Sequence, residues 1–552
     1  MDTQRLVLFV ALSLTILFMW QAWQKDYGPQ PVPASVSTAM SETAPATTEG
    51  VPTGDLPRDV PRLESAPAAS APEAAKAVSA SPRVHVVTDV LDLEIDTRGG
   101  DIRELDLPTY PVAVDTPDQP FRLMGDQADL FYVAQSGLLS TADAPDHHAL
   151  YTAEATEYRL PAGQDELRVP LHWTGTDGLE VTKIFIFKRG AFSLTVEHQV
   201  TNRGQAPWSG RQYRQLQRTK PDEAHTQRFV NTYTGAAIYS PEAKYEKIKF
   251  EDMEKHPLDR DIHGGWGAMI QHYFVAAWVP LQDQVNHYYS KVLSGSHYVL
   301  GMISEPRELA PGASTTFTST LFAGPKLQNE MAALATGLDL TVDYGYLTVI
   351  AKPVYWLLEF AHDLIGNWGW AIVIVTLLIK LAFYRLSATS YRSMANMRKL
   401  QPRLQAIKER YGDDRQKLNE KMMQIYKDEK INPLGGCLPI AIQIPVFIAL
   451  YWVLLESVEL RQAPFILWIN DLSTKDPYYV LPILMGITML AQQKLNPAPI
   501  DPIQAKVMMA LPFVFTVFFA FFPSGLVLYW VVNSGLSIAQ QWMITRSIEA
   551  AK

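Results

Sequence analysis

Residues 370–384, WAIVIVTLLIKLAFY, have the composition of a membrane-spanning helix and contain one charged side chain, Lys380. An ammonium at the centre of a spanning helix costs about 2.5–3.5 kcal/mol on insertion scales, so such a residue must face protein, water or a route to the surface. Thr376 precedes Lys380 by one helical turn and lies on the same face. We therefore predict a functional cavity at Lys380, inside a helical membrane region.

Other apolar segments precede and follow this stretch, and together they predict a polytopic α-helical membrane protein. The first segment ends in bulky residues rather than in a small-residue cleavage site, which favours a retained anchor (1–27) over a cleaved signal peptide. The span that holds Lys380 is short, with barely fifteen apolar residues against the usual 17 to 25 or so. The six predicted spans are residues 6–23, 369–385, 434–457, 478–493, 507–522 and 525–545.

The segment between the first two spans has two parts of different composition. Residues 28–82 contain ten prolines among small and polar residues, a composition that predicts a disordered linker. From residue 83 to about 330, apolar and polar residues alternate in runs such as 181–187, and glycine-containing turns separate the runs. Alternation of this kind predicts antiparallel strands, and its length predicts one large all-β sandwich domain outside the cytoplasm.

A basic segment follows the second span. Residues 385–432 hold twelve lysines and arginines against six acids, so the positive-inside rule places this segment in the cytoplasm. Its apolar residues recur at helical spacing on both sides of residues 411–414, which predicts a hairpin of two amphipathic helices. The hairpin is either a solvated charged surface or a contact for anionic lipid or ribosomal RNA. The candidate recruitment residues are Arg392, Arg398, Lys399, Arg403, Lys408, Arg415 and Lys417.

The remaining topology follows from counting spans. Both termini are expected in the cytoplasm, with five spans and the hairpin forming a core over residues 366–545 and a short tail at 546–552. Residues 349–365 place charged and polar side chains at helical spacing among apolar ones. This pattern favours an amphipathic helix at the membrane surface, while packing beneath the β-domain is the alternative.

Polar residues recur inside the predicted spans: Thr376 and Lys380, Gln443, and Asn533 with Ser537. Because several spans contribute polar faces at similar depth, we favour a shared, water-accessible cationic groove. The alternative is that these side chains only bond neighbouring helices, or that Lys380 extends to the membrane surface.

Common catalytic and nucleotide-binding motifs are absent from the sequence. We therefore expect a protein that is not an enzyme and has no catalytic residues, no metal site and no cofactor. A secondary transporter that uses the intramembrane lysine is an alternative function, although no internal repeat is visible. A membrane-anchored sugar-binding sensor is a third interpretation, and it rests on the β-domain alone.

Five motifs resemble those of a known family. They are residues 432–439 (NPLGGCLP), 443–447 (QIPVF), 458–465 (VELRQAPF), 476–486 (DPYYVLPILMG) and 522–529 (FPSGLVLY). In this order they resemble the YidC membrane protein insertases. The anchor and large β-domain resemble the Gram-negative form of the family, so the resemblance covers nearly the whole chain.

The resemblance implies an insertase and chaperone of the bacterial inner membrane, with a periplasmic β-supersandwich domain. It would receive hydrophobic nascent proteins, alone or with the Sec translocon, and help them fold. The missing phosphate loop agrees with insertion without nucleotide hydrolysis, and the basic hairpin makes the ribosome a further expected partner. The family's groove typically carries an arginine where this chain has Lys380, which keeps the positive charge and loses the forked donor geometry. The resemblance also implies a hydrophobic slide at Ile444, Phe447, Phe518 and Trp530.

Overall fold

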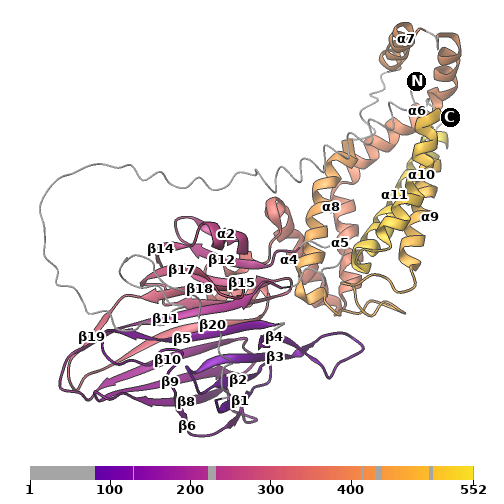
Figure 1. Cartoon of the computed structure of the whole chain (residues 1–552). Helices are drawn as coiled ribbons and strands as arrows, with labels where there is room; N and C mark the ends of the chain where they lie inside the picture. Colours follow the sequence, from indigo (N-terminus) through magenta and orange to yellow (C-terminus); the bar gives the residue numbers. More distant parts are fainter. Residues whose placement is uncertain are drawn as a thin grey trace, which may run out of the picture.

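The computed structural model describes residues 81–127, 130–221, 232–411, 414–429, 438–496 and 502–550. The predicted anchor (1–27), the linker up to residue 80, Cys437 and the side chain of Arg415 lie outside this description. A β-domain comes first in the chain, and a region of long helices follows it. The two lie side by side, with α4 (Thr348–Ile365) between them (Figure 1).

The β-domain consists of two sheets in the described residues, one 11-stranded and one 9-stranded. In the first sheet the order is β14-β17-β18-β11-β5-β4-β3-β2-β1-β7, and β19 pairs with β11. Its strands are β1 (Arg83–Val87), β2 (Asp92–Asp96), β3 (Asp101–Pro111), β4 (Pro120–Asp126), β5 (Phe131–Ser140), β7 (Glu157–Arg159), β11 (Trp208–Thr219), β14 (Asp259–His263), β17 (Val285–Leu293), β18 (His297–Ser304) and β19 (Arg307–Leu309).

The second sheet has the order β13-β12-β15-β16-β20-β10-β9-β8-β6. Every pairing in it is antiparallel, as the alternating sequence predicts. Its strands are β6 (Thr152–Ala153), β8 (Glu166–Thr174), β9 (Leu179–Lys188), β10 (Ser193–Asn202), β12 (Gly235–Ser240), β13 (Lys244–Ile248), β15 (Trp266–Gln271), β16 (Phe274–Pro280) and β20 (Ser314–Pro325).

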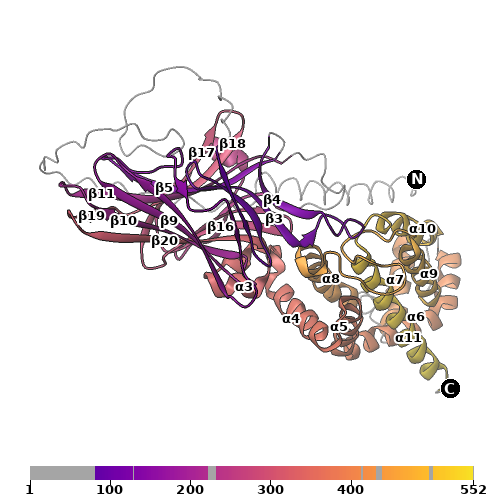
Figure 2. The same cartoon turned by 90° about the horizontal axis from the view of Figure 1, so that it is seen from below.

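Burial follows the period of the strands. In β10 nearly every second side chain is buried, including Leu194, Val196 and Val200, because one face of the sheet packs on the domain core. Central strands such as β16 are buried on both faces. A short helix, α2 (Phe250–Lys255), buries Phe250 and Met253 in the same core. The prediction of a large all-β sandwich is therefore confirmed, and Figure 2 shows its long strands from below.

The helical region begins directly after β20. The two helices of the predicted hairpin are α6 (Tyr384–Tyr411) and α7 (Arg415–Asp428). The Asp414 side chain accepts a hydrogen bond from the Lys417 N–H at the start of α7. The elements are α3 (Gln328–Leu334), η2 (Leu338–Thr341), η3 (Gly345–Leu347), α4, α5 (Trp368–Ala382), α6 (Tyr384–Tyr411), α7 (Arg415–Asp428), α8 (Leu438–Glu456), η5 (Val458–Leu460), α9 (Val480–Leu495), α10 (Pro502–Phe519) and α11 (Ser524–Ala550).

By length and composition, no single helix among the described residues is long and apolar enough to cross a membrane. The pair α5 and α6 meets the requirement only together, with a bend of 68° between its members. The sequence predicts one helix over 369–385, but the structure ends α5 at Ala382 and starts α6 at Tyr384. The bend coincides with a contact from another helix, since Gln540 Nε2 of α11 donates to the Tyr384 carbonyl at 3.2 Å.

A buried ion pair joins the β-domain to the helices. Lys326, just after β20, lies 2.8 Å from Glu456 at the end of α8, and the side chains are only 2% and 3% exposed. The Lys326 ammonium also donates to the Thr341 carbonyl. Nearby, Arg461 Nη2 donates to the Pro111 carbonyl at the end of β3. The two regions therefore meet through specific polar contacts rather than through a simple tether.

His272 lies in the same interface and predicts a pH effect. Its Nε2 bonds to the Leu455 carbonyl at 2.9 Å, and burial together with the nearby Lys326 and Arg461 charges lowers the pKa of His272 to about 4. In the unfolded chain the imidazole titrates near pH 6.5, so between pH 6.5 and 4 the unfolded state binds more protons than the folded one. The stability from neutral His272 is therefore complete above pH 6.5 and is lost as the pH falls toward 4.

We expect His272→Gln to flatten the pH dependence of unfolding in that window, because an amide N–H can donate to Leu455 without titrating. The wild-type loss attributable to this histidine is at most about 2–3 kcal/mol. Denaturant unfolding of the full chain at pH 7, 5.5 and 4 measures it. If the free energy of unfolding changes equally with pH in both proteins, His272 contributes nothing to the pH dependence of stability.

Candidate functional site

Lys380 forms part of a hydrogen-bonded chain across three helices. Its ammonium donates to Ser537 Oγ of α11 at 2.7 Å, and the Ser537 hydroxyl donates to the Asn533 carbonyl one turn earlier. The Asn533 side-chain oxygen accepts from Gln443 Nε2 of α8, also at 2.7 Å. The structure therefore brings together four of the five predicted groove residues, from α5, α8 and α11.

The charge of Lys380 is not neutralised within this group. Its side chain is buried, with the residue 8% exposed, and none of the ion pairs among the described residues includes it. A buried ammonium held only by a hydroxyl retains a strong attraction for an incoming carboxylate. The site is thus a localised positive charge in apolar surroundings.

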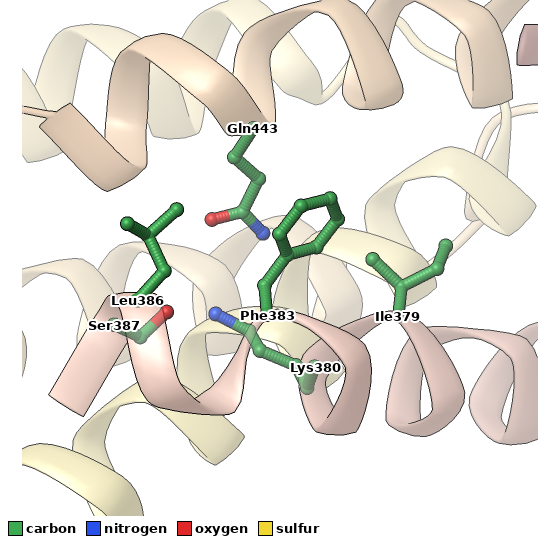
Figure 3. A pocket seen from close by; sticks show the side chains of 6 residues that line it. All are labelled: Ile379, Lys380, Phe383, Leu386, Ser387 and Gln443. Carbon is green, nitrogen blue, oxygen red and sulfur yellow. The ribbon is translucent and has the colours of Figure 1, made fainter.

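The hollow beside Lys380 is small. Its volume is about 10 Å³, which is about what a single water needs. Figure 3 shows Gln443 reaching toward Lys380 from the helix on the opposite side, with the Phe383 ring beside its amide. The lining residues are Ile379, Lys380, Phe383, Leu386, Ser387 and Gln443. In this conformation two of the predicted groove residues, Lys380 and Gln443, line a cavity of one-water size.

Thr376, the fifth predicted residue, forms its hydrogen bond within its own helix. Its hydroxyl donates to the Ile372 carbonyl of its own helix, and its side chain is buried. The sequence interpretation missed Ser387, which lines the hollow. Ser387 lies in α6, beyond the bend that follows Lys380, so helical spacing within one span could not reveal it.

Aromatic rings extend from this hollow along α8, α10 and α11. Phe447 packs edge-to-face on Trp530, with ring centroids 4.6 Å apart, and Trp530 packs on Phe519 at 5.3 Å. Phe518 contacts Phe519 and is 42% exposed, and Ile444 is 49% exposed. Phe447, Trp530 and Phe518 are therefore linked through Phe519 into one aromatic cluster, and Ile444 lies exposed one turn before Phe447 on α8.

The hairpin carries its bases on the outside. Arg392, Arg398, Lys399, Arg403 and Lys417 are exposed and Lys408 is half-buried, whereas Leu400 and Leu404 form a buried seam. Arg403 pairs with Glu429 at 2.8 Å, and Lys417 pairs with Asp414 at 3.2 Å. Exposed pairs of this kind contribute about 1 kcal/mol or less, so the bases remain available to a partner.

Comparisons with known proteins cover the whole chain. Residues 83–357 match the family model "YidC periplasmic domain", and residues 360–551 match "60Kd inner membrane protein". Two proteins named membrane protein insertase YidC, from Thioalkalivibrio sulfidiphilus and Methylococcus capsulatus, are 56% and 55% identical. Each alignment covers 100% of this chain and 99% of the relative.

Among solved structures, the crystal structure titled as an active YidC insertase with the first transmembrane domain resolved is similar over 84% of this chain and 92% of its own. The sequence identity is 18% and the TM-score is 0.39. The alternative of a secondary transporter receives no support from any of these comparisons. The helical region that holds Lys380 and the β-domain before it each match their counterpart in one family. The chain therefore belongs to the YidC family of membrane protein insertases, with a large periplasmic β-sandwich domain and a helical carboxy-terminal region.

Proposed function

We propose that this insertase receives the polar, translocated segment of a nascent membrane protein at Lys380. The observation that carries this proposal is the buried ammonium, which is bonded to Ser537 and has no carboxylate partner among the described residues. Acidic side chains of the entering segment would pair with Lys380, while Gln443, Asn533 and Ser537 would bond its polar groups. This pairing needs a positive charge and hydrogen-bond donors, but it does not need the planar, bidentate guanidinium of an arginine.

The small volume of the hollow implies that a wall must move before a peptide enters. Phe383, Leu386 and Ser387 form one wall, and they lie at the bend where α5 gives way to α6. We propose that the hairpin swings about this bend, so that the one-water hollow opens into a hydrated groove. The joint is suited to such a motion because the helix is already interrupted there.

The apolar part of the substrate then moves along the slide. Phe447, Trp530 and Phe518, with Ile444 beside them, would guide it toward lipid along α8 and α10. Moving about 20 apolar residues from water into a bilayer is favourable by many kcal/mol, at about 25 cal/mol per Å² of apolar surface. We therefore propose insertion without nucleotide hydrolysis.

The membrane topology that supports this mechanism has six spans, with both termini and the hairpin in the cytoplasm. The hairpin projects from the end of the helical region away from the β-domain, as Figure 1 shows, and this arrangement suits opposite sides of a membrane. We assign α4 to the outer membrane surface. It buries Ala351, Val354 and Leu358, and it leaves Trp356 and Phe360 about 60% exposed.

The partners proposed are nascent membrane proteins, the ribosome, anionic lipid and the Sec translocon. Ribosome contact is assigned to the hairpin because its exposed bases suit RNA phosphate. We expect Arg392→Glu with Arg403→Glu to weaken ribosome binding at least tenfold, with a reduced salt dependence. Sedimentation of the full chain with ribosomes at two salt concentrations measures this. The charge-reversed pair Arg159→Glu with Arg168→Glu on the β-domain should bind like wild type, and equal loss in both would contradict the assignment.

Site-specific photo-crosslinking during synthesis of a short membrane protein tests the proposed path. A photoreactive residue at 387, which lines the hollow and leaves Lys380 in place, should capture the polar segment of the substrate, and one at 447 should capture its apolar helix. A probe at Leu150, an exposed position in the β-domain, serves as the control. Equal capture at all three positions, or capture only at Leu150, would refute the path.

A further inference from the structure

A second, larger hollow lies between α6, α9 and α11. Its volume is about 220 Å³, against the 10–15 Å³ or so that one water needs. It shares no lining residue with the hollow at Lys380. The lining residues are Ala395, Arg398, Lys399, Leu495, Gln541, Thr545 and Ile548.

The charged side chains that line this hollow in the described part of the chain are both positive. Arg398 and Lys399 line it, no acid does, and neither base takes part in an ion pair within the described part of the chain. Arg403, one turn further along α6, is paired with Glu429. Two adjacent uncompensated cations at the mouth of a hollow indicate an anionic ligand, and phosphate is the oxyanion that such donors bind most readily.

The buried side-chain amide of Gln541 requires a hydrogen-bond donor in the ligand. Gln541 is 2% exposed, and its Nε2 donates to the Leu495 carbonyl and to Asn496 Oδ1. Its side-chain oxygen Oε1 is buried and has no hydrogen-bond partner among the described residues. A buried acceptor left unpaired costs about 1–3 kcal/mol, so a ligand with an O–H or N–H group would complete it.

The neighbouring surface of α11 indicates where the hollow lies relative to the membrane surface. Trp542 and Met543 are 50% and 52% exposed, and the Arg546 guanidinium lies over the Trp542 ring at 4.5 Å. An exposed tryptophan capped by an arginine is typical of the membrane–water interface, where lipid phosphates lie. The apolar lining by Leu495 and Ile548 suits the glycerol backbone of a lipid.

We propose that this hollow binds the headgroup of an anionic phospholipid, a phosphodiester with a hydroxyl-bearing arm such as phosphatidylglycerol. Arg398 and Lys399 pair with the phosphate, and a headgroup hydroxyl donates to Gln541 Oε1. A zwitterionic headgroup satisfies this site less well, since its ammonium would face two cations. The lipid would tie α6 of the hairpin to α11 at the membrane surface, and this holds whether or not Lys380 receives the substrate.

Native mass spectrometry of the detergent-solubilised full chain tests the proposal, with phosphatidylglycerol, phosphatidylethanolamine and phosphatidylcholine titrated separately. We expect one phosphatidylglycerol to bind at least tenfold more tightly than either zwitterionic lipid. Arg398→Ala with Lys399→Ala should abolish that preference. Lys417→Ala with Lys421→Ala removes the same charge from α7 and should keep it. Ala395→Leu fills part of the hollow without changing charge and should also abolish the preference, with an unchanged unfolding midpoint as the folding control.

Several results would overturn the proposal. One is equal binding of all three lipids. A second is that the Lys417/Lys421 control loses the preference for phosphatidylglycerol as fully as the Arg398/Lys399 variant does. A third is full binding in the Ala395→Leu variant, because this would indicate only diffuse attraction to surface charge. Competition by millimolar inorganic phosphate with no lipid retention would assign the hollow to a free anion. Loss of ribosome binding with unchanged lipid binding in the Arg398/Lys399 variant would assign these bases to RNA.

Discussion

Lys380→Ala is expected to lower the insertion of substrates with acidic translocated segments by at least tenfold. Two unit charges 4 Å apart attract by about 4 kcal/mol at an effective dielectric constant of 20, and a tenfold change needs only about 1.4 kcal/mol. Lys380→Arg keeps the charge and should retain most of the activity. Insertion into proteoliposomes of matched substrates, with acidic or neutral translocated segments, measures the effect.

Two controls separate the charge from the packing. Lys380→Met keeps most of the side-chain volume, so it should behave like the alanine variant with acidic substrates and like wild type with neutral ones. Lys494→Ala removes an exposed lysine at the end of α9 and should have little effect. Full insertion of acidic substrates by the Lys380→Ala protein would contradict the proposal that this ammonium receives them.

Lys326→Met is expected to destabilise the junction between the β-domain and the helices by about 3–5 kcal/mol, because it leaves the buried Glu456 carboxylate without its cation. Denaturant unfolding of the full chain in detergent, with proteolysis at the junction as a second readout, measures the loss. Lys326→Met combined with Glu456→Leu should recover most of the stability, since an apolar pair leaves no buried charge.

The matched comparison is the ion pair between Lys352 of α4 and Asp339 of η2, at 2.7 Å, in which the lysine side chain is 46% exposed. Lys352→Met should cost less than about 1 kcal/mol, because water screens that pair. Similar losses in the two single variants would mean that the buried pair does not hold the junction. A double variant as unstable as Lys326→Met would point to lost packing instead.

Much of this architecture could be predicted because it follows from local patterns. Alternation over residues 83–330 predicts the sandwich, and the sandwich is present. The polar residues Gln443, Asn533 and Ser537 stand out in apolar spans, and the structure joins them to Lys380. A polar group buried among apolar helices must find a partner, so its presence in the sequence already implies the contact.

Other features depend on contacts between distant segments. No proline or glycine marks Phe383, so the bend there could not be predicted from local sequence, and Gln540, which contacts it, lies 156 residues beyond Tyr384. The pairing of Lys326 with Glu456, 130 residues apart, requires the two regions to be docked. Thr376 shares a predicted face with Lys380, but its hydroxyl donates to a nearer acceptor, the Ile372 carbonyl of its own helix.

The early end of α5 has a consequence for the lipid itself. Fifteen residues of helix are about 22 Å long, and the sixteen of α9 are about 24 Å, against an apolar layer of about 30 Å. Such helices match a locally thinned bilayer. In the proposed topology, a polar segment that crosses beside these helices has a shorter apolar barrier to pass. We therefore expect lipids with longer acyl chains, which form thicker membranes, to slow insertion.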